Sequence, residues 1–579
     1  MKKTLTLIIT LLFITTVYGQ SNFGKIQGKV TDKNTKDPIA YATIMLEKDG
    51  IRKGGAYTDD NGKYAINALD PGTYKITVKY LDYSDKVITD IVVSSNSTKF
   101  LNIEMGQTED GAAAITQVVV TAGRPMIEKD KNQQSLSSKD ITKLPTRSLN
   151  AIAATSSAVT QTSAGLSFIG SRTDGTAYYV DGVRVVGSAS VPQAAQGQID
   201  IIQSGIPAQY GDFTGGAISV TTKGPSRYKA RSFELISSSP FDPYHFNQAE
   251  FSSVGPLWIK NKGGGEDEIV AIGYQLAGNF NYTVDASPGY GGFYVVKDEV
   301  LEEIEKNPLT LNPNGAGLIF RSSLLNTDDL VKEKARRNVG RYFGNFQGKL
   351  EFQPNKNATI SLFGSYNRGE GNNFQYSQSL MNYKENSMST SQTLRTYLKF
   401  TQRLGSDDDG TDASADKKKQ LFTGAFYNIR VDYQSSWSET QNRTHQDNYF
   451  DYGYLGKFTS KRSPFYQYVN DPTKHIDQNG DTVTRQGYYN LAAFFNTEID
   501  FEASDKNEFR SNYTKNFFQD AEDRGQNVFS EFQILQGLGL LNGYNAGSTY
   551  GLWSNPGTVA YNYGRSQYER AAAYAQGEA

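Results

Sequence analysis

From about Arg227 onward, hydrophobic and polar positions alternate with a period of two residues. Successive side chains of a β-strand point to opposite faces, so this alternation predicts strands with one apolar and one polar face. In the clearest segment one face carries Ile272, Tyr274, Leu276, Gly278, Phe280, Tyr282 and Val284, and the other carries Gly273, Gln275, Ala277, Asn279, Asn281 and Thr283. Similar stripes run through Tyr342 to Phe352, Ala358 to Tyr366, Leu394 to Leu404, Leu421 to Trp437, Phe495 to Phe501 and Phe509 to Phe517.

The lengths of the strands and of their connections indicate an antiparallel barrel that crosses a membrane. A tilted strand needs roughly 9–11 residues to cross a bilayer, and outer-membrane barrels alternate short turns with long loops. The shorter connections are Lys260 to Asp267, Pro354 to Asn357, Gly405 to Lys419 and Ala503 to Lys506, and the longer ones are Asp285 to Gly340, Arg368 to Thr390 and Ser438 to Tyr489. About nine strands are expected, with a tenth near Tyr568 to Tyr574, whereas a plugged receptor barrel has about 22. Residues 227–579 are therefore interpreted as the first part of a large, incomplete transmembrane β-barrel.

A different pattern, of short strands, covers residues 22–106. Turn sequences such as Asp59-Asp60-Asn61-Gly62 and Asp70-Pro71-Gly72 separate the strands. Short strands at roughly 8–12-residue spacing predict a β-sandwich. The expected strands are Ile26 to Val30, Tyr41 to Glu47, Lys63 to Ile66, Thr73 to Tyr80 and Val92 to Ile103.

Residues 107–124 combine a small, polar linker with a β-branched run. The run contains Gln117, Val118, Val119, Val120, Thr121 and Ala122. A segment of this kind, next to a linker, can add as a strand to the edge of a partner's sheet. The alternative is that it forms the first strand of the domain that follows.

Residues 125–226 contain short apolar strands between glycine-containing turns. The apolar segment Tyr178 to Val185 contains Asp181-Gly182, which is a hairpin-turn signal. Tyr210-Gly211 and Gly215-Gly216 precede a second apolar strand. Glycines at such positions predict a positive φ or a close approach of the backbone.

The motifs of residues 22–106 resemble the carboxypeptidase regulatory-like domain. They are Gly28-Lys29-Val30-Thr31-Asp32, Pro38-Ile39, Ala42-Thr43-Ile44, Thr58 to Tyr64 and Leu69 to Tyr74. The resemblance implies a seven-stranded sandwich of the carbohydrate-binding-like class. It does not imply a peptidase, because the histidines His245, His445 and His475 all lie outside this region.

The ordered motifs of residues 125–226 resemble the plug of TonB-dependent outer-membrane receptors. They are Ser167 to Arg172, Thr176 to Val185, Ile199 to Gly211 and Gly215 to Lys223, with Arg184 in place of the family's usual proline and Ile206 inserted between Gly205 and Pro207. The resemblance implies a small α+β plug domain inside a barrel. It assigns Gln117, Val118, Val119, Val120, Thr121 and Ala122 to interaction with TonB, and Asp181, Gly182, Tyr210, Gly211, Gly215 and Gly216 to the structural motif of the plug.

The N-terminus and the composition fit an exported protein. Lys2 and Lys3 precede the apolar run Leu5 to Val17, so residues 1–19 are expected to be a signal peptide cleaved after Gly19. The chain has 37 Tyr, 31 Phe and no Cys, which excludes disulfides and thiolate metal sites. A net charge of −2 gives no support to nucleic-acid binding.

The sequence contains no pattern that favours an enzyme. It shows no nucleophile elbow, zinc pair or phosphate-binding loop, and no cofactor or metal is expected. The acidic run Asp407 to Asp412 lacks the glycine and the glutamate of a calcium-binding EF-hand loop, so it is interpreted as a solvated turn.

The leading hypothesis is an outer-membrane receptor that imports a nutrient with energy coupled through TonB. The expected partners are the TonB–ExbB–ExbD complex, outer-membrane lipid and a surface substrate-binding lipoprotein, and the N-terminal sandwich is expected in the periplasm. The substrate-binding residues are unknown at this level, and peptide, oligosaccharide, siderophore and cobalamin all stay open as ligands. The alternative is an accessory outer-membrane docking protein of a protein-secretion or surface-display complex.

Overall fold

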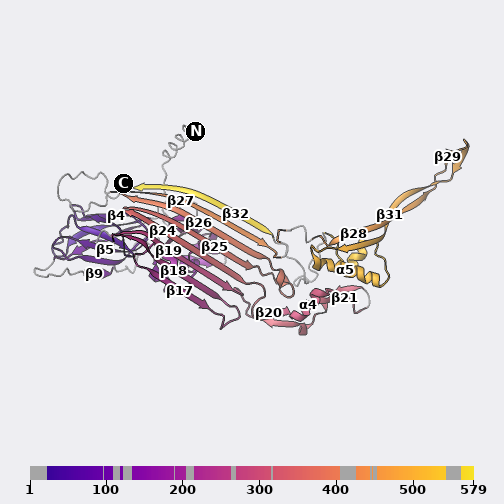
Figure 1. Ribbon diagram of the computed structural model, residues 1–579, viewed down its shortest axis with the longest axis horizontal. Helices are drawn as coiled ribbons and strands as arrows, with labels where there is room; N and C mark the ends of the chain where they lie inside the picture. Colours follow the sequence, from indigo (N-terminus) through magenta and orange to yellow (C-terminus); the bar gives the residue numbers. More distant parts are fainter. Residues whose placement is uncertain are drawn as a thin grey trace.

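The computed structural model shows a mainly β chain with three regions: a sandwich, a small α+β domain and a long antiparallel sheet (Figure 1). The predicted fold class is confirmed in these respects, and the sheet is open rather than closed. The structure describes residues 23–95, 97–107, 118–121, 133–162, 164–187, 189–203, 214–261, 269–314, 317–355, 357–404, 425–443, 446–447, 453–542 and 563–578.

The N-terminal region is a sandwich of two sheets. Its strands are β1 (Gly24–Asp32), β2 (Thr43–Lys48), β3 (Ile51–Tyr57), β4 (Lys63–Leu69), β5 (Gly72–Lys79), β6 (Lys86–Val93), β7 (Thr98–Phe100), β8 (Ile103–Met105) and β9 (Val118–Thr121). One sheet has the order β4-β1-β7, with β8 also on β1, and the other has the order β3-β2-β5-β6-β9. Ile26, Leu46 and Ile76 are fully buried between the sheets, as the alternation along each strand requires.

Several details of the sandwich differ from the expectation. It has nine described strands rather than seven, and β6 was expected only at its last two residues. The segment Val92 to Ile103 is not one strand, because β6 ends at Val93 and the backbone turns, with the amide of Ser97 donating to the carbonyl of Ser94. Strand β3 was not anticipated, because Arg52 to Gly55 shows no apolar alternation. Main-chain pairing with β2 makes it a strand.

The second region is the small α+β domain. Its elements are β10 (Gln133–Ser137), α2 (Ser138–Ile141), α3 (Leu149–Ala153), β11 (Val159–Thr162), β12 (Gly165–Phe168), η1 (Thr173–Gly175), β13 (Ala177–Val180), β14 (Val183–Val185), η2 (Gln193–Ala195), β15 (Gln196–Ile202) and β16 (Ala217–Thr222). Five strands form one sheet in the order β10-β15-β16-β13-β14. The names plug domain and plug sheet are used below for this region and its sheet.

The third region is a sheet of eight described strands, called the long sheet below. Its strands are β17 (Ala230–Ser237), β18 (Asn247–Lys260), β19 (Ile269–Thr283), β24 (Arg341–Asn355), β25 (Ala358–Asn372), β26 (Met388–Arg403), β27 (Phe426–Gln441) and β32 (Gly564–Glu578). Each strand pairs antiparallel with its neighbour in this order. The strand expected near Tyr568 to Tyr574 is confirmed as part of β32.

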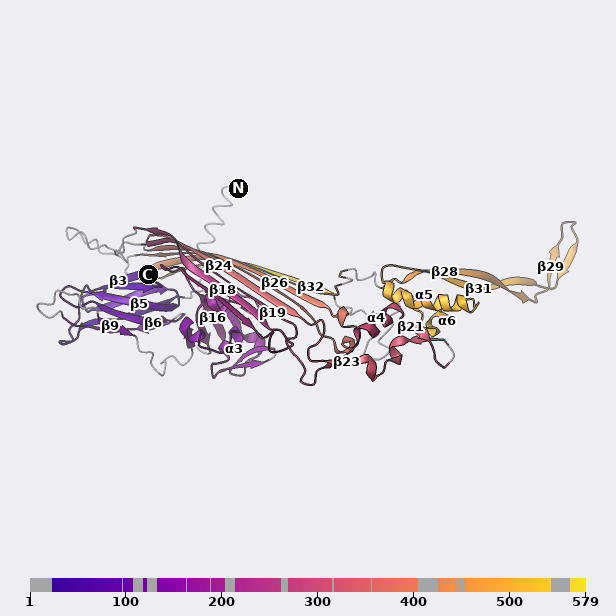
Figure 2. The same cartoon turned by 60° about the horizontal axis from the view of Figure 1, so that its bottom comes forward.

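The connections at the end of the long sheet far from the sandwich carry structure of their own (Figures 1 and 2). The elements are β20 (Phe293–Val296), α4 (Asp298–Lys306), β21 (Leu309–Leu311), β22 (Leu318–Phe320), η3 (Arg321–Leu324), η4 (Thr327–Asp329), β23 (Leu330–Glu333), η5 (Tyr376–Gln378), η6 (Tyr383–Glu385), β28 (Gly456–Val469), β29 (Thr473–Ile476), β30 (Thr482–Arg485), β31 (Tyr488–Ala503), α5 (Glu508–Asp523) and α6 (Glu531–Gln536). The short turn between β24 and β25 lies at the opposite end, near the sandwich. The expected connections Lys260 to Asp267 and Gly405 to Lys419 fall almost entirely outside the described residues.

The interpretation of two alternating segments as barrel strands was wrong. Phe509 to Phe517 lies in helix α5, because Phe509, Tyr513 and Phe517 fit a spacing of four residues as well as a spacing of two. Phe495 to Phe501 is a strand, but it belongs to β31, which pairs with β28 in a separate hairpin. The segment Ala503 to Lys506 joins this hairpin to α5 and is therefore no turn of the long sheet.

The plug domain packs on one face of the long sheet (Figure 2). This face is mostly polar, and Ala277, Phe363 and Tyr397 are its side chains in the apolar core of the plug. Gln275 and Gln347, on that face, are fully buried. Phe280 and Leu350 point to the other face, where they are 52% and 45% exposed. Among the residues that the structure describes, no helix is long and apolar enough to cross a membrane. The long sheet thus buries polar side chains and exposes apolar ones.

Candidate functional site

The segment expected to bind TonB is an edge strand of the sandwich. β9 pairs in parallel with β6, with Val119 opposite Val87 and Val120 opposite Ile88. It is the last strand of its sheet, and Val119 and Val120 are 61% and 40% exposed. Main-chain pairing rather than side-chain burial therefore holds Val119 and Val120. Of the six predicted residues, Gln117 and Ala122 lie outside the described part of the chain.

The described pairing between β6 and β9 reaches as far as Thr89, and residues 122–132 lie outside the described part of the chain. The register ends with Thr89 opposite Thr121, and Asp90 has a φ of 60°, which is uncommon for a residue other than glycine. The carboxylate of Asp90 also binds the Lys139 ammonium of α2 at 2.9 Å, which joins this part of β6 to the plug domain.

Asp181 and Gly182 form the predicted tight turn. They join β13 to β14 with φ values of 50° and 81°, and two consecutive positive φ values define a type I′ hairpin turn. The turn directs the Asp181 side chain toward the long sheet, where it is buried.

The carboxylate of Asp181 joins the plug domain to the long sheet. Within the plug domain it accepts from the amide of Thr222 at 2.8 Å and from its hydroxyl at 2.7 Å. The Tyr397 hydroxyl of β26 donates to it at 2.8 Å, and the Lys349 ammonium of β24 lies 2.8 Å away. Burial by itself raises the pKa of Asp181, but the Lys349 charge and the Thr222 hydrogen bonds outweigh burial and hold the pKa below its usual value.

The paired glycines of the plug are required by close packing. A Cβ atom on Gly216 would lie 2.1 Å from the ring of Phe168, and one on Gly215 would lie 2.9 Å from the carbonyl oxygen of Gly175. Neither position has room for a side chain. Tyr210 and Gly211, which belong to the same predicted motif, lie outside the described residues.

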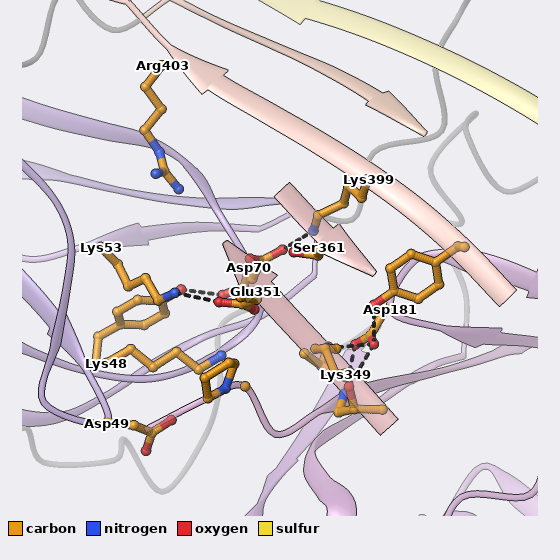
Figure 3. A pocket seen from close by; sticks show the side chains of 16 residues that line it. Lys48, Asp49, Lys53, Asp70, Asp181, Lys349, Glu351, Ser361, Lys399 and Arg403 are labelled. Carbon is orange, nitrogen blue, oxygen red and sulfur yellow. Dashed lines mark hydrogen bonds and ion pairs between the residues drawn. The ribbon is translucent and has the colours of Figure 1, made fainter. Parts of the chain in front are cut away.

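The sandwich, the plug domain and the long sheet meet at one charged junction (Figure 3). Lys53 of the sandwich binds Glu351 of β24 at 2.9 Å, and Lys399 of β26 binds Asp70 of the sandwich at 2.7 Å. Arg403 of β26 donates to a sandwich carbonyl, that of Ala68, at 2.7 Å. The space between these side chains, about 30 Å³, has room for about two water molecules. The junction is therefore a packed contact and too small for a nutrient.

A second contact joins the sandwich directly to the plug sheet. Asp200 of β15 is fully buried, and its carboxylate accepts from the Ser95 amide at 3.0 Å, the Ser135 hydroxyl at 2.6 Å and the Gln198 side-chain amide at 2.8 Å. The hydroxyls of Ser135 and Ser94 lie 2.7 Å apart, which links the edge strand β10 to the sandwich. Burial raises the pKa of Asp200 despite these hydrogen bonds.

Sequence reasoning identified Asp181 and the glycines but missed the residues that meet them. Lys349 carried a usable signal, because it is a charged residue on the polar face of an alternating strand. Tyr397 and Asp200 carried none, because each looks like any other residue of its strand. In the described part of the chain, no cluster of three or more His, Cys, Asp or Glu residues could hold a metal ion.

Comparison with known families identifies the N-terminal region. Residues 25–106 match the carboxypeptidase regulatory-like domain, so this prediction is confirmed. A comparison with curated proteins finds no match.

Several solved structures of outer-membrane receptors are similar to part of the chain. A mutant of the ferric enterobactin receptor of Pseudomonas aeruginosa is 15% identical with a TM-score of 0.30, over 54% of this chain and 49% of that one. The siderophore receptor PirA of Pseudomonas aeruginosa is 16% identical with a TM-score of 0.28, over 55% and 52% of the two chains. PirA of Acinetobacter baumannii is 15% identical with a TM-score of 0.31, over 54% and 48%. The matched region spans about half the length of these receptors, and at such values the likeness does not extend to function.

Proposed function

We propose that this chain is the plug-bearing part of an outer-membrane receptor that imports a nutrient with energy supplied through TonB. The observation that carries the proposal is the inverted burial of the long sheet. Leu350 and Phe346 are 45% and 48% exposed while Gln347 between them is fully buried. An apolar outer face fits lipid, and a polar inner face fits a lumen.

The position of the plug domain is evidence for a transport function rather than for passive anchoring. It lies on the polar face and is held there by the Asp181 contacts with Lys349 and Tyr397. Such a plug can occupy two arrangements, one that closes the lumen and one that opens it, and a pull on the N-terminal side would favour the second. The motifs at Gln117–Ala122 and at Asp181-Gly182 and Gly215-Gly216 support the same assignment.

The proposal places the sandwich and β9 in the periplasm. The sandwich lies at the end of the long sheet that has the short turn between β24 and β25, and the elaborate connections lie at the other end. Short turns face the periplasm in outer-membrane barrels, and long loops face outward. The surface loops would then offer the first contact with the ligand and with a lipoprotein partner.

Proline substitution in β9 tests the energy coupling. Val119→Pro removes a main-chain donor, so it should abolish energy-dependent uptake by the full receptor in cells. Surface abundance and ligand binding at the surface should stay unchanged. Val119→Thr keeps the donor and the β-branch and is the matched control.

Growth and uptake measurements on the same cells distinguish nutrient import from the role of a docking protein. A substrate-dependent growth defect in the deletion strain supports import. Normal uptake by the proline variant would show that TonB coupling does not act through this segment. Co-purification with a secretion channel, together with normal growth on every nutrient tested, would favour the docking protein instead.

A further inference from the structure

We propose that the docked sandwich holds the plug domain in place, and that the sandwich leaves the long sheet before the plug moves. The charged junction couples the two events, because neighbouring rows of the long sheet bind the two domains there. The inference rests on the proposed function for the meaning of plug movement. The coupling itself belongs to the chain and can be measured without TonB and without a nutrient.

The first observation is a row of the long sheet that binds the plug domain. Lys349 of β24 and Tyr397 of β26 lie on either side of Phe363 of β25. Both contact the carboxylate of Asp181, the first through its ammonium and the second through its hydroxyl, each at 2.8 Å. The Tyr397 and Phe363 rings stack with their centroids 4.9 Å apart, which fixes this row.

The second observation is that the next row binds the sandwich. Glu351 and Lys399 lie on either side of Ser361, two residues along the same strands. Glu351 binds Lys53 at 2.9 Å. Lys399 binds Asp70 at 2.7 Å. Residues two apart on a strand share a face and lie about 6.6 Å apart, so both rows line one small space (Figure 3).

The third observation is that this space is closed around Lys349. The Lys349 side chain is only 7% exposed, and the space beside it measures about 30 Å³. Of the two contacts with the sandwich, the Lys53–Glu351 pair is the better buried, because the Asp70 side chain is 45% exposed. Exposed ion pairs contribute little, so Lys53 is the contact to change in a test.

Withdrawal of the plug is unfavourable while the sandwich is docked. It would leave the Lys349 ammonium buried without its counter-charge, and an uncompensated buried charge is strongly destabilising. Glu351 is the neighbouring carboxylate on β24, but it is already bound to Lys53. The docked sandwich thus blocks both ways in which the charge of Lys349 could be balanced, by water and by Glu351.

Undocking of the sandwich opens both ways. Water then reaches Lys349, and the attraction between Lys349 and Asp181 falls as the effective dielectric constant rises. Glu351 loses Lys53 and becomes available to Lys349. The sandwich also contacts the plug sheet through Ser95 and Asp200, so a pull on the sandwich acts on the plug once the junction has opened.

Hydrogen–deuterium exchange of the full receptor in detergent tests this order. The Arg227 amide, just before β17, donates to the Asp49 carbonyl of the sandwich at 3.1 Å, so its exchange reports docking of the sandwich. The paired amides of β16 report the plug sheet. In the unmodified receptor, the β16 amides should be protected at least as strongly as the Arg227 amide. Weaker protection of β16 would overturn the order, because the plug would then open while the sandwich is docked.

Lys53→Glu tests the coupling by placing a like charge against Glu351. It should speed exchange of the Arg227 amide and of β16 about tenfold. Lys75→Glu is the matched control, because Lys75 pairs with Glu47 at 2.9 Å within the sandwich. It should leave exchange at both sites within about twofold of the unmodified receptor. An equal effect of the two variants on β16 would overturn the coupling.

Glu351→Gln repeats the test without any change in the sandwich, so unfolding of the sandwich cannot be the cause. It removes the partner of Lys53 and should speed exchange at both sites. Loss of the Glu351 charge also removes a carboxylate that repels Asp181, so faster exchange of β16 would come from undocking. Unchanged or slower exchange of β16 in this variant and in Lys53→Glu would overturn the inference.

A double-variant cycle tests whether the coupling acts through Asp181. In an Asp181→Asn background, Lys53→Glu should change β16 exchange by less than about twofold. Gly216→Ala loosens the plug by a different route, a clash with the Phe168 ring, and in that background the effect should stay about tenfold. A tenfold effect in both backgrounds would overturn the role of Asp181. TonB and nutrient are absent throughout, so the uptake measurements remain a separate test of the proposed function.

Discussion

The sandwich and the long sheet are built from the same alternating strands but bury opposite faces. In the sandwich, Leu46 and Ile76 are fully buried. In the long sheet, Gln347 is fully buried and Leu350 is 45% exposed. Alternation alone thus predicts a two-faced strand without telling which face becomes the interior. The second sheet of the sandwich covers its apolar face, whereas the plug domain covers the polar face of the long sheet.

The largest expected effect concerns the polar interior. Asp181→Asn should destabilise the folded chain by about 3–5 kcal/mol, because it leaves the buried Lys349 ammonium without its counter-charge. Asparagine tolerates the positive φ of this turn, so the backbone is kept, while the charge is lost together with hydrogen bonds that one carboxylate oxygen accepts from Tyr397 and the Thr222 hydroxyl. Urea denaturation of the detergent-solubilised protein measures the effect. Adding Lys349→Met should recover part of the loss, and no recovery would show that the ion pair is not the cause.

Substitutions of two leucines, one in the sandwich and one in the long sheet, test whether the two regions bury opposite faces. Leu46→Ala should cost about 2–5 kcal/mol, because it opens a cavity in a closed core. Leu350→Ala should change stability by about 0.5 kcal/mol or less in detergent, because its side chain is open to the surroundings. Denaturation curves of the two variants provide the measurement. Equal losses would mean that the outer face of the long sheet is covered by protein.

A charged substitution on the outer face of the long sheet tests whether lipid surrounds that face. Leu350→Arg should disfavour insertion into lipid by about 2–4 kcal/mol if the residue lies near the bilayer centre. Folding of the full receptor into lipid vesicles, compared with its folding in detergent, measures this difference. Leu350→Phe is the control and should insert normally. Normal insertion of the arginine variant would argue against a lipid-facing surface.

The smallest expected effect is a difference between two carboxyl groups in their dependence on pH. The amide of Thr35, the Tyr83 hydroxyl and the amide of Asn34 lower the pKa of Asp32, so its contribution to stability is present above about pH 4 and is lost as the pH falls through the folded-state pKa. Burial raises the pKa of Asp200, so its native state binds the extra proton. Stability should therefore fall as the pH rises from about 4 through the folded-state pKa of Asp200.

Denaturation at a series of pH values separates the two groups. Asp200→Asn should remove the fall in stability at rising pH, and Asp32→Asn should remove the loss at acidic pH. Identical pH profiles for the two variants would contradict the opposite directions of the two pKa shifts.

Much of the architecture could be predicted from local pattern, and little of its long-range chemistry. Alternation located β19, β24 and β25 and sorted the side chains of each onto two faces, because side-chain direction is a local property. It failed at Phe509 to Phe517, where a spacing of four residues fits helix and strand equally well. The turn at Asp181-Gly182 was predictable, because positive φ selects these residue types.

The partners of that turn were not predictable in the same way. Tyr397 is 216 residues from Asp181 in the chain, and only the docking of the plug domain on β26 brings the two together. The pairing of β9 with β6 was missed for a related reason. A short β-branched run is compatible with any open edge, and the sequence does not say which edge lies nearest.

The parallel pairing of β9 with β6 also has a mechanical consequence. Four residue pairs hold the strand, and each hydrogen bond contributes about 0.5–1.5 kcal/mol net. A pull along the strand axis loads all the pairs together, whereas a pull across it breaks them one after another. The first geometry passes tension through the sandwich and its contacts at Asp200 and Lys399. The second peels the strand away and passes tension only along the chain beyond Thr121, so the direction of a pull decides which joint of the molecule yields first.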